Sequence, residues 1–255
     1  MSERVKIILD KNADILRLPA IALRGLVVFP GNIIHFEVGR KKSIAAIEWA
    51  MSNNNAVFLT AQQDMDVEDP GFKDLYAYGV VAEVKQVLRV SDELVKVLVE
   101  GKYRAKLLTL DSSGRFLLAS TKAAALRGTK SVDSARVEAL VRSVKEAFEE
   151  YLSLNPRLSK DVVYTIITNE DAALLCDYIP ANLLLKYTDK QALLNEGTVS
   201  GRLEKLLEIL RRETKILHIE KDIQSKVNEQ MDKNQRDYYL REQMRAISNE
   251  LDDFD

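Results

Sequence analysis

The C-terminal stretch constrains this chain most, because neither glycine nor proline occurs in residues 202–255. Glycine and proline interrupt helices more strongly than other residues, so their absence predicts one unbroken helix. At a rise of 1.5 Å per residue, this helix would be about 75 Å long. Little of the remaining chain can cover such a length, so we expect the helix to project.

The apolar residues divide this predicted helix into two parts. The first turns carry four leucines that we expect to pack on preceding helices: Leu203, Leu206, Leu207 and Leu210. Further on, a thinner stripe has steps of three or four residues: Ile216, Ile219, Ile223, Val227 and Met231. This spacing is typical of a nearly straight helix or of weak helix pairing rather than of a strict heptad. Acid–base pairs such as Glu229 and Lys233 would stabilise the exposed turns by about 0.3–0.5 kcal/mol each.

The N-terminal half has a different pattern, in which short apolar runs alternate with turn residues. Runs rich in Val, Ile, Leu and Phe predict strands at 33–38, 56–61, 80–90, 94–100, 104–110 and 115–121. Turn residues around Asp92 and around Ser113 predict two hairpins. One helix is predicted at about 43–51, with Ile44 and Ile47 on one face. A single helix among antiparallel strands indicates a curled sheet or pseudo-barrel that the helix closes on one side.

Between these zones, from about 134 to 195, the apolar spacing becomes helical. A first helix should end near Asn155-Pro156, and shorter helical segments follow at 162–167 and at 172–179, the latter ended by Pro180. The sequence therefore predicts an α+β fold in three parts. These are a β-rich domain over residues 1–125, a helical bundle over 126–201 and a long helix over 202–255.

Composition excludes several classes of protein. The chain has 255 residues and is 46% hydrophobic and 30% charged, enough to bury a core. Its net charge of −2 supplies no uniform field for a polyanion, so a nucleic-acid partner is not indicated. No run approaches the roughly 20 apolar residues that span a bilayer, so no membrane partner is expected. Cys176 is the only cysteine, which excludes an intrachain disulfide, and we expect a cytoplasmic chain.

The sequence contains no catalytic constellation. Its glycines lack the spacing of a phosphate-binding loop, and no Lys-Ser or Lys-Thr pair follows a second glycine at that spacing. His35, His218 and Cys176 are scattered along the chain, so no metal site is predicted. Ser159 and the Thr198–Ser200 segment are interpreted as helix N-caps. We therefore expect no catalytic residue, metal or cofactor in these residues.

Two stretches resemble a known family. The first contains these motifs in order: Leu18-Pro19, Leu23-Arg24, Val28-Phe29-Pro30-Gly31, Gly39-Arg40, Ser43-Ile44, Gly79-Val80-Val81 and Lys96-Val97-Leu98-Val99-Glu100-Gly101. They resemble the N-terminal domain of Lon, the ATP-dependent protease of bacteria and organelles. The second stretch, KNQRDYYLREQMRAISNEL, is similar to the segment that Lon proteases carry just before their ATPase module. The resemblance covers nearly the whole chain and implies a PUA-like LON domain with a first strand near 18–24.

The resemblance also implies a function, with this chain as the non-catalytic N-terminal part of an ATP-dependent protease. In the family, the long helix continues into an ATPase, which binds ATP and Mg²⁺, and then into a serine endopeptidase with a Ser-Lys dyad. The N-terminal part is expected to recognise unfolded, damaged or degron-bearing proteins. Its long helices are expected to support homo-oligomer assembly, a hexamer in the family and a dimer or higher oligomer for this region alone.

Three groups of residues are candidates for these contacts. The first lies at a turn and contains Phe29, Pro30 and Ile33; the alternative is that Phe29 belongs to the core and Pro30-Gly31 only sets the turn. The second lies on the distal helix: Met231, Tyr238, Tyr239, Leu240, Met244 and Ile247. Its alternative role is contact with the ATPase or a neighbouring subunit. The third is the stripe for helix pairing: Ile216, Ile219, Ile223 and Val227.

Two other functions stay open at this point. A stand-alone small-ligand or adaptor module on the same fold would require a deep closed pocket. A structural coiled-coil spacer would require only the long helix and would leave the β-rich domain without a role.

Overall fold

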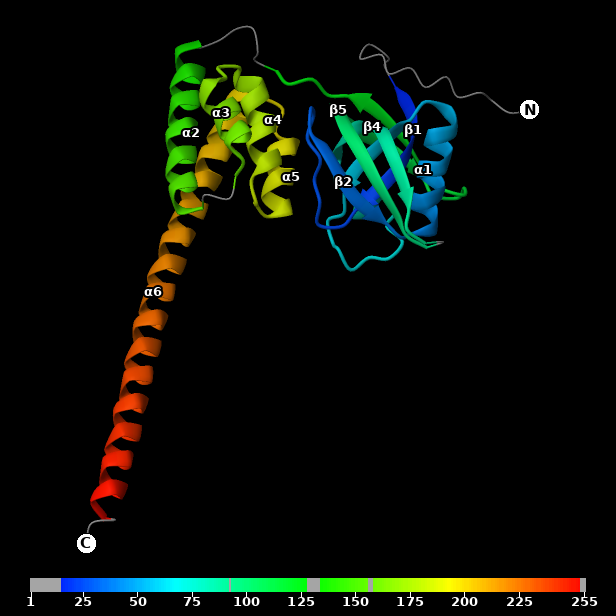
Figure 1. Ribbon diagram of the computed structural model, residues 1–255. Coiled ribbons are helices and arrows are strands. Elements are labelled where there is room, and N and C mark those ends of the chain that lie inside the picture. The colour runs from blue at the N-terminus through cyan, green and yellow to red at the C-terminus, as the bar shows by residue number, and fades with distance from the viewer. Residues whose placement is uncertain (1–14, 92, 128–133, 156–157, 253–255) are drawn as a thin grey trace.

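The structure is a computed structural model that describes residues 15–91, 93–127, 134–155 and 158–252. A β-rich body and a helical body lie beside each other, and the last helix extends away from both (Figure 1). The fold is therefore α+β, as predicted. Asp92 and Pro156, which the sequence analysis placed at a turn and at a helix end, lie outside the described residues.

Six strands form a sheet in the described part of the chain: β1 (Leu16–Leu23), β2 (Ile33–Val38), β3 (Ala56–Ala61), β4 (Tyr78–Arg89), β5 (Val95–Asp111) and β6 (Leu117–Ala123). Their order is β2-β5-β4-β3-β1-β6, and β5 also pairs with β6. This second pairing closes β5, β4, β3, β1 and β6 into a barrel, which confirms the predicted pseudo-barrel. Only β1 and β3 run parallel; the other paired strands are antiparallel.

Helix α1 (Lys41–Asn53) closes one side of the barrel (Figure 1). Its buried face includes Ile44, Ile47 and Ala50, which join the same core cluster as Val57 and Leu59 of β3. Every residue of β3 is buried, because β3 lies between β1 and β4 and has side chains packed on both of its faces. Strands predicted at 33–38 and 56–61 coincide with β2 and β3.

The structure joins two predicted strands into one, since β5 contains 104–110 and all of 94–100 except Leu94. Residues 101–103, the gap between the two predicted strands, belong to the same strand, and Gly101 lies opposite Ala82 in the ladder with β4. Glycine is needed there for space. A Cβ on Gly101 would lie 2.2 Å from the carbonyl oxygen of Phe29, which crosses over β5 at this point. On one edge, β5 pairs first with β2 and then with β6.

In the described part of the helical body, four helices precede the long one: α2 (Ser134–Leu154), α3 (Lys160–Thr168), α4 (Ala172–Asn182) and α5 (Tyr187–Asn195). Ser159 caps α3 by accepting a hydrogen bond from the N–H of Val162, as predicted. Pro180 does not end α4 but lies inside its last turn. A proline lacks only its own N–H, so the residues after it can still donate and the helix continues to Asn182. Helix α5 was not predicted.

The last helix, α6, spans Val199–Asp252. At its start, Thr198 Oγ1 accepts a hydrogen bond from the N–H of Gly201, which confirms the predicted cap. Leu203, Leu206 and Leu210 are fully buried, and α6 packs mainly on α2. From residue 218 to residue 247 every side chain is exposed. The helix therefore projects, as Figure 1 shows.

We predict that Gly101→Ala destabilises the protein by about 3 kcal/mol, because the added methyl group overlaps main-chain atoms that cannot move aside freely. The measurement is the free energy of unfolding from urea denaturation. Gly114→Ala is the matched control, since its Cβ would lie 3.6 Å from its nearest neighbour and Gly114 has no positive φ. Equal stability of the two variants would contradict the close approach of Phe29 to β5.

Candidate functional site

The predicted turn site divides into a buried part and an exposed part. Phe29 is fully buried, so its prediction as a contact residue is wrong and the core alternative is correct. Gly31 has a φ of 74°, and the N–H of Asn32 donates to the Phe29 carbonyl at 3.2 Å. Proline followed by a positive-φ glycine is typical of a type II turn, which directs Phe29 inward. Pro30 is half-buried, whereas Ile33 at the start of β2 is 62% exposed.

A groove of about 310 Å³ lies next to β2. Phe36, Val38 and Gly39 line one side, and the end of β1 with Leu26 lines the other. Arg40 lies at this groove and donates to the carbonyl of Ala22 and to the side chain of Gln62. The groove is therefore mostly apolar, with a guanidinium at one end.

The predicted residues on α6 are all exposed. Ile216 is 37% exposed, at the point where the helix leaves the bundle, and the others are between 46% and 70% exposed: Ile219, Ile223, Val227, Met231, Tyr238, Tyr239, Leu240, Met244 and Ile247. The structure does not bring these residues together with Pro30 or Ile33, since they lie on the projecting part of α6 (Figure 1). Such a series of apolar side chains in water marks an interaction surface.

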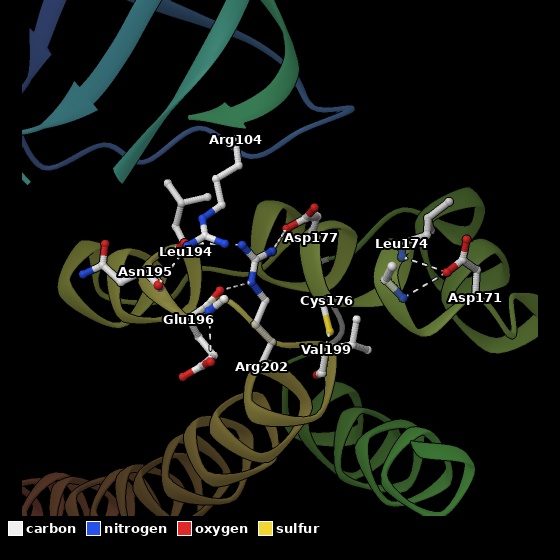
Figure 2. Close-up of polar contacts among 12 residues, drawn as sticks. Arg104, Asp171, Leu174, Cys176, Asp177, Leu194, Asn195, Glu196, Val199 and Arg202 are labelled. Atoms are coloured by element: carbon white, nitrogen blue, oxygen red, sulfur yellow. Dashed lines mark hydrogen bonds and ion pairs between the residues drawn. The ribbon is translucent and has the colours of Figure 1, made fainter. Parts of the chain in front are cut away.

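A third feature is the junction between the barrel and the bundle, which is held by two arginines (Figure 2). Arg202 of α6 is fully buried and forms an ion pair with Asp177 of α4. Its Nε and Nη2 donate to the carbonyls of Glu196 at 3.0 Å and Leu194 at 3.3 Å. These carbonyls lie at and just beyond the C-terminus of α5, where helical hydrogen bonding leaves acceptors without partners. Arg202 therefore ties α4, α5 and α6 together.

Arg104 reaches the same place from the barrel (Figure 2). It belongs to β5, is 6% exposed, donates to the carbonyl of Asn195 at 3.0 Å and stacks over the ring of Tyr78 at 4.2 Å. Burial, with a further contribution from Arg202, lowers the pKa of Arg104. Two buried guanidiniums thus lie at the same helix end. The carbonyls of that helix end and the carboxylate of Asp177, which pairs with Arg202, offset the repulsion between the two cations.

Further hydrogen bonds connect the two bodies. Gln191 Nε2 donates to the carbonyl of Tyr78 at 2.9 Å, and the N–H of Arg127 donates to the carbonyl of Gly197 at 2.9 Å. Tyr187 Oη donates to the carbonyl of Gln63 at 3.1 Å. Sequence reasoning missed all of these residues. Because their partners are carbonyls far along the chain, no local spacing could have identified them.

Cys176 lies beside Asp177 at this junction (Figure 2). Burial raises the pKa of the Cys176 thiol to about 12, so the thiol is unreactive near neutral pH. Among the residues that the structure describes, no three His, Cys, Asp or Glu side chains are placed to hold a metal ion. No helix of the described ranges is both long enough and apolar enough to cross a bilayer.

Comparison with known proteins agrees with this architecture. Residues 17–212 match the sequence model of the ATP-dependent protease La (LON) substrate-binding domain. This chain belongs to the Lon substrate-binding domain family. It is 40% identical to a Lon protease of Brevibacillus choshinensis over 239 residues, which are 93% of this chain and 30% of that protein.

Other Lon proteins show the same relationship. The Lon protease of Escherichia coli strain K12 is 38% identical over 245 residues, which are 96% of this chain and 31% of that protein. The N-terminal domain of the Mycobacterium avium complex Lon protease has a TM-score of 0.62 at 20% identity, covering 76% of this chain and 98% of that domain, and shares the fold. The chain thus spans about 30% of the length of the curated Lon proteases it matches.

The junction predicts a pH dependence of stability. Burial raises the pKa of Asp177 to about 6, above the roughly 3.9 of an unfolded chain, despite the nearby Arg202. The folded state therefore binds the proton more tightly, and the stability from this group is present below about pH 4 and is lost as the pH rises through about 6.

We expect the free energy of unfolding of Asp177→Asn to change less between pH 4.5 and 7 than that of the wild type, by on the order of 2 kcal/mol. Urea denaturation at several pH values measures this difference. Asp222→Asn, on the exposed part of α6, is the control and should follow the wild type. Parallel pH profiles of Asp177→Asn and the wild type would show that Asp177 does not titrate differently on folding.

Proposed function

We propose that this chain recognises unfolded or degron-bearing proteins and supports homo-oligomer assembly as the N-terminal part of an ATP-dependent Lon-type serine protease. In this proposal residues 1–125 and 126–201 form the recognition domain and bundle, and 202–255 form the connecting helix. ATP and Mg²⁺ would bind in the ATPase, and the Ser-Lys dyad would cleave peptide bonds, in other parts of that protease.

The observation that carries the proposal is the series of exposed apolar residues on α6 in a chain of the Lon substrate-binding domain family. Unfolded proteins differ in sequence but share exposed apolar side chains, so a binder for many of them needs accessible apolar surface. Methionines such as Met231 and Met244 suit this role because their flexible side chains adapt to different partners.

The proposed recognition is tested by titrating the protein with fluorescently labelled, reduced and carboxymethylated lactalbumin, which cannot fold. We expect binding of this form and none of native lactalbumin, because only the unfolded form exposes a continuous apolar chain. A small-ligand module or a structural spacer would bind neither form. Binding of both forms with equal affinity would also contradict the proposal.

The distal part of α6 is tested with Tyr239→Gln/Met244→Gln. Glutamine keeps helix propensity but removes apolar contact, so we expect roughly tenfold weaker binding of unfolded lactalbumin. Tyr164→Gln/Leu184→Gln is the matched control, because these side chains are 70% and 76% exposed on the bundle. Unchanged binding by the Tyr239/Met244 variant would assign these residues to a neighbouring subunit or the ATPase instead.

The proximal stripe predicts self-association. Two helices that pair along Ile216, Ile219, Ile223 and Val227 would remove these side chains from water. We expect dimers or higher oligomers in sedimentation velocity over a concentration series, and a shift to monomer for Ile219→Gln/Ile223→Gln. A strict monomer at high concentration would contradict an assembly role for this stripe.

A further inference from the structure

Strand β2 is the open edge of the sheet. Among the strands that the structure describes, it pairs only with β5, whereas the other five form the closed barrel. The register with β5 shows which main-chain N–H and carbonyl groups of β2 have no partner on β5. The N–H of Gly101 donates to the carbonyl of Asn32 at 2.9 Å. Because hydrogen-bonded pairs alternate in an antiparallel ladder, Ile34, Phe36 and Val38 bond to β5.

The intervening residues of β2 therefore direct their N–H and carbonyl groups away from β5. These residues are Ile33, His35 and Glu37. Among the described residues, no main-chain hydrogen bond from outside the β2–β5 ladder reaches them. Their side chains are exposed on the outer face of the sheet, so neither the main chain nor the side chains of this edge are covered.

This edge lacks the usual protection against pairing with another chain. Natural edge strands are commonly interrupted by proline, lysine or a bulge. The sequence of β2 contains neither proline nor lysine, and its ladder with β5 runs without a register shift from Ile33 to Val38. Glu37 is the only Asp, Glu, Lys or Arg of the strand and forms an ion pair with Lys96 at 3.2 Å. The edge is thus a regular, accessible template of donors and acceptors.

The groove of about 310 Å³ lies beside this edge. It is lined by Phe36, Glu37 and Val38 of β2 and by Ile21 and Leu23 of β1. An apolar side chain can enter between these two strands.

Arg24 and Arg40 also line this groove, and the guanidiniums of both donate to the carbonyl of Val67. Burial, followed by repulsion from Arg24, lowers the pKa of Arg40, so a carboxylate placed here would relieve the repulsion between the two cations. Asp69 and Glu68 act on Arg40 in the opposite direction but do not line the groove.

We propose that β2 binds an extended segment of an unfolded polypeptide as an added strand, with an apolar side chain in the groove and an acidic side chain beside Arg24 and Arg40. This inference rests on the proposed function and assigns it a binding mode. Main-chain hydrogen bonds are independent of sequence, so strand addition can hold many different clients, while the groove and the arginines favour some sequences over others.

The test separates main-chain from side-chain recognition at one position. His35→Pro removes an outward N–H without touching the β5 ladder, whereas His35→Ala removes the side chain and keeps that N–H. The probes are unfolded lactalbumin and a short labelled peptide of alternating valine and threonine with one glutamate. We expect His35→Pro to bind the peptide at least about tenfold more weakly than wild type, and His35→Ala to bind within about twofold.

Two further measurements use the wild-type protein, so that a folding defect of His35→Pro cannot obscure the result. Hydrogen exchange should show new protection of the amides of Ile33, His35 and Glu37 on peptide binding. A peptide with N-methylated amides along one edge should lose binding, and replacing its glutamate by glutamine should weaken binding roughly threefold.

Other outcomes overturn the inference. Equal binding by both His35 variants, or binding of the N-methylated peptide with the affinity of its parent, excludes strand addition. So does edge protection that appears on self-association without peptide, because a second copy of the chain would then occupy β2. If the wild type binds unfolded lactalbumin but the amides of β2 gain no protection from hydrogen exchange, the inference fails and the proposed function stands. Wild type that binds the peptide but not unfolded lactalbumin contradicts the proposed function alone.

Discussion

The architecture depends on how one buried cation, Arg202, is neutralised. Its guanidinium is fully buried, and it contacts Asp177 of α4 and two carbonyls at the end of α5. Burying this charge without such partners would lower the stability of the fold by several kcal/mol, so α4, α5 and α6 are held in the positions that supply them. Arg104 of the barrel joins the same cluster by donating a hydrogen bond to the carbonyl of Asn195. One polar network therefore connects the two bodies at the point where α6 begins.

The rigidity of that base contrasts with the rest of α6. Beyond the bundle, no side chain of residues 218–247 is buried, so this part of the helix rests on local main-chain hydrogen bonds and a few pairs such as Lys233 and Glu229 at 2.8 Å. Isolated helices gain little from such pairs. The isoleucines, tyrosines and methionines on this part of α6 are exposed to water. The open edge of β2 is a second uncovered surface, since β2 pairs with β5 alone whereas each of the other described strands pairs with at least two neighbours.

Sequence pattern predicted the elements where one residue type or spacing dominates locally. The runs at 33–38 and 56–61 are β2 and β3, and the region free of glycine and proline is α6. Predictions failed where distant packing decides. The strands predicted at 94–100 and 104–110 are one strand, and β5 continues through Gly101, whose missing Cβ leaves the space that the Phe29 carbonyl occupies. Phe29 itself was a candidate contact, and the Pro30-Gly31 turn directs it into the core.

The sequence by itself determined the α+β class, the curled sheet with one helix, the projecting α6 and the family, because these depend on composition, periodicity and ordered motifs. Only the tertiary structure decided the junction and the open edge. Arg104 and Asn195 are 91 residues apart, and the partners of both arginines are mostly main-chain carbonyls, which are identical in every residue. Likewise, whether a strand lies at an edge depends on which strands pair beside it, and β2 is uncovered because β6, not β2, completes the barrel.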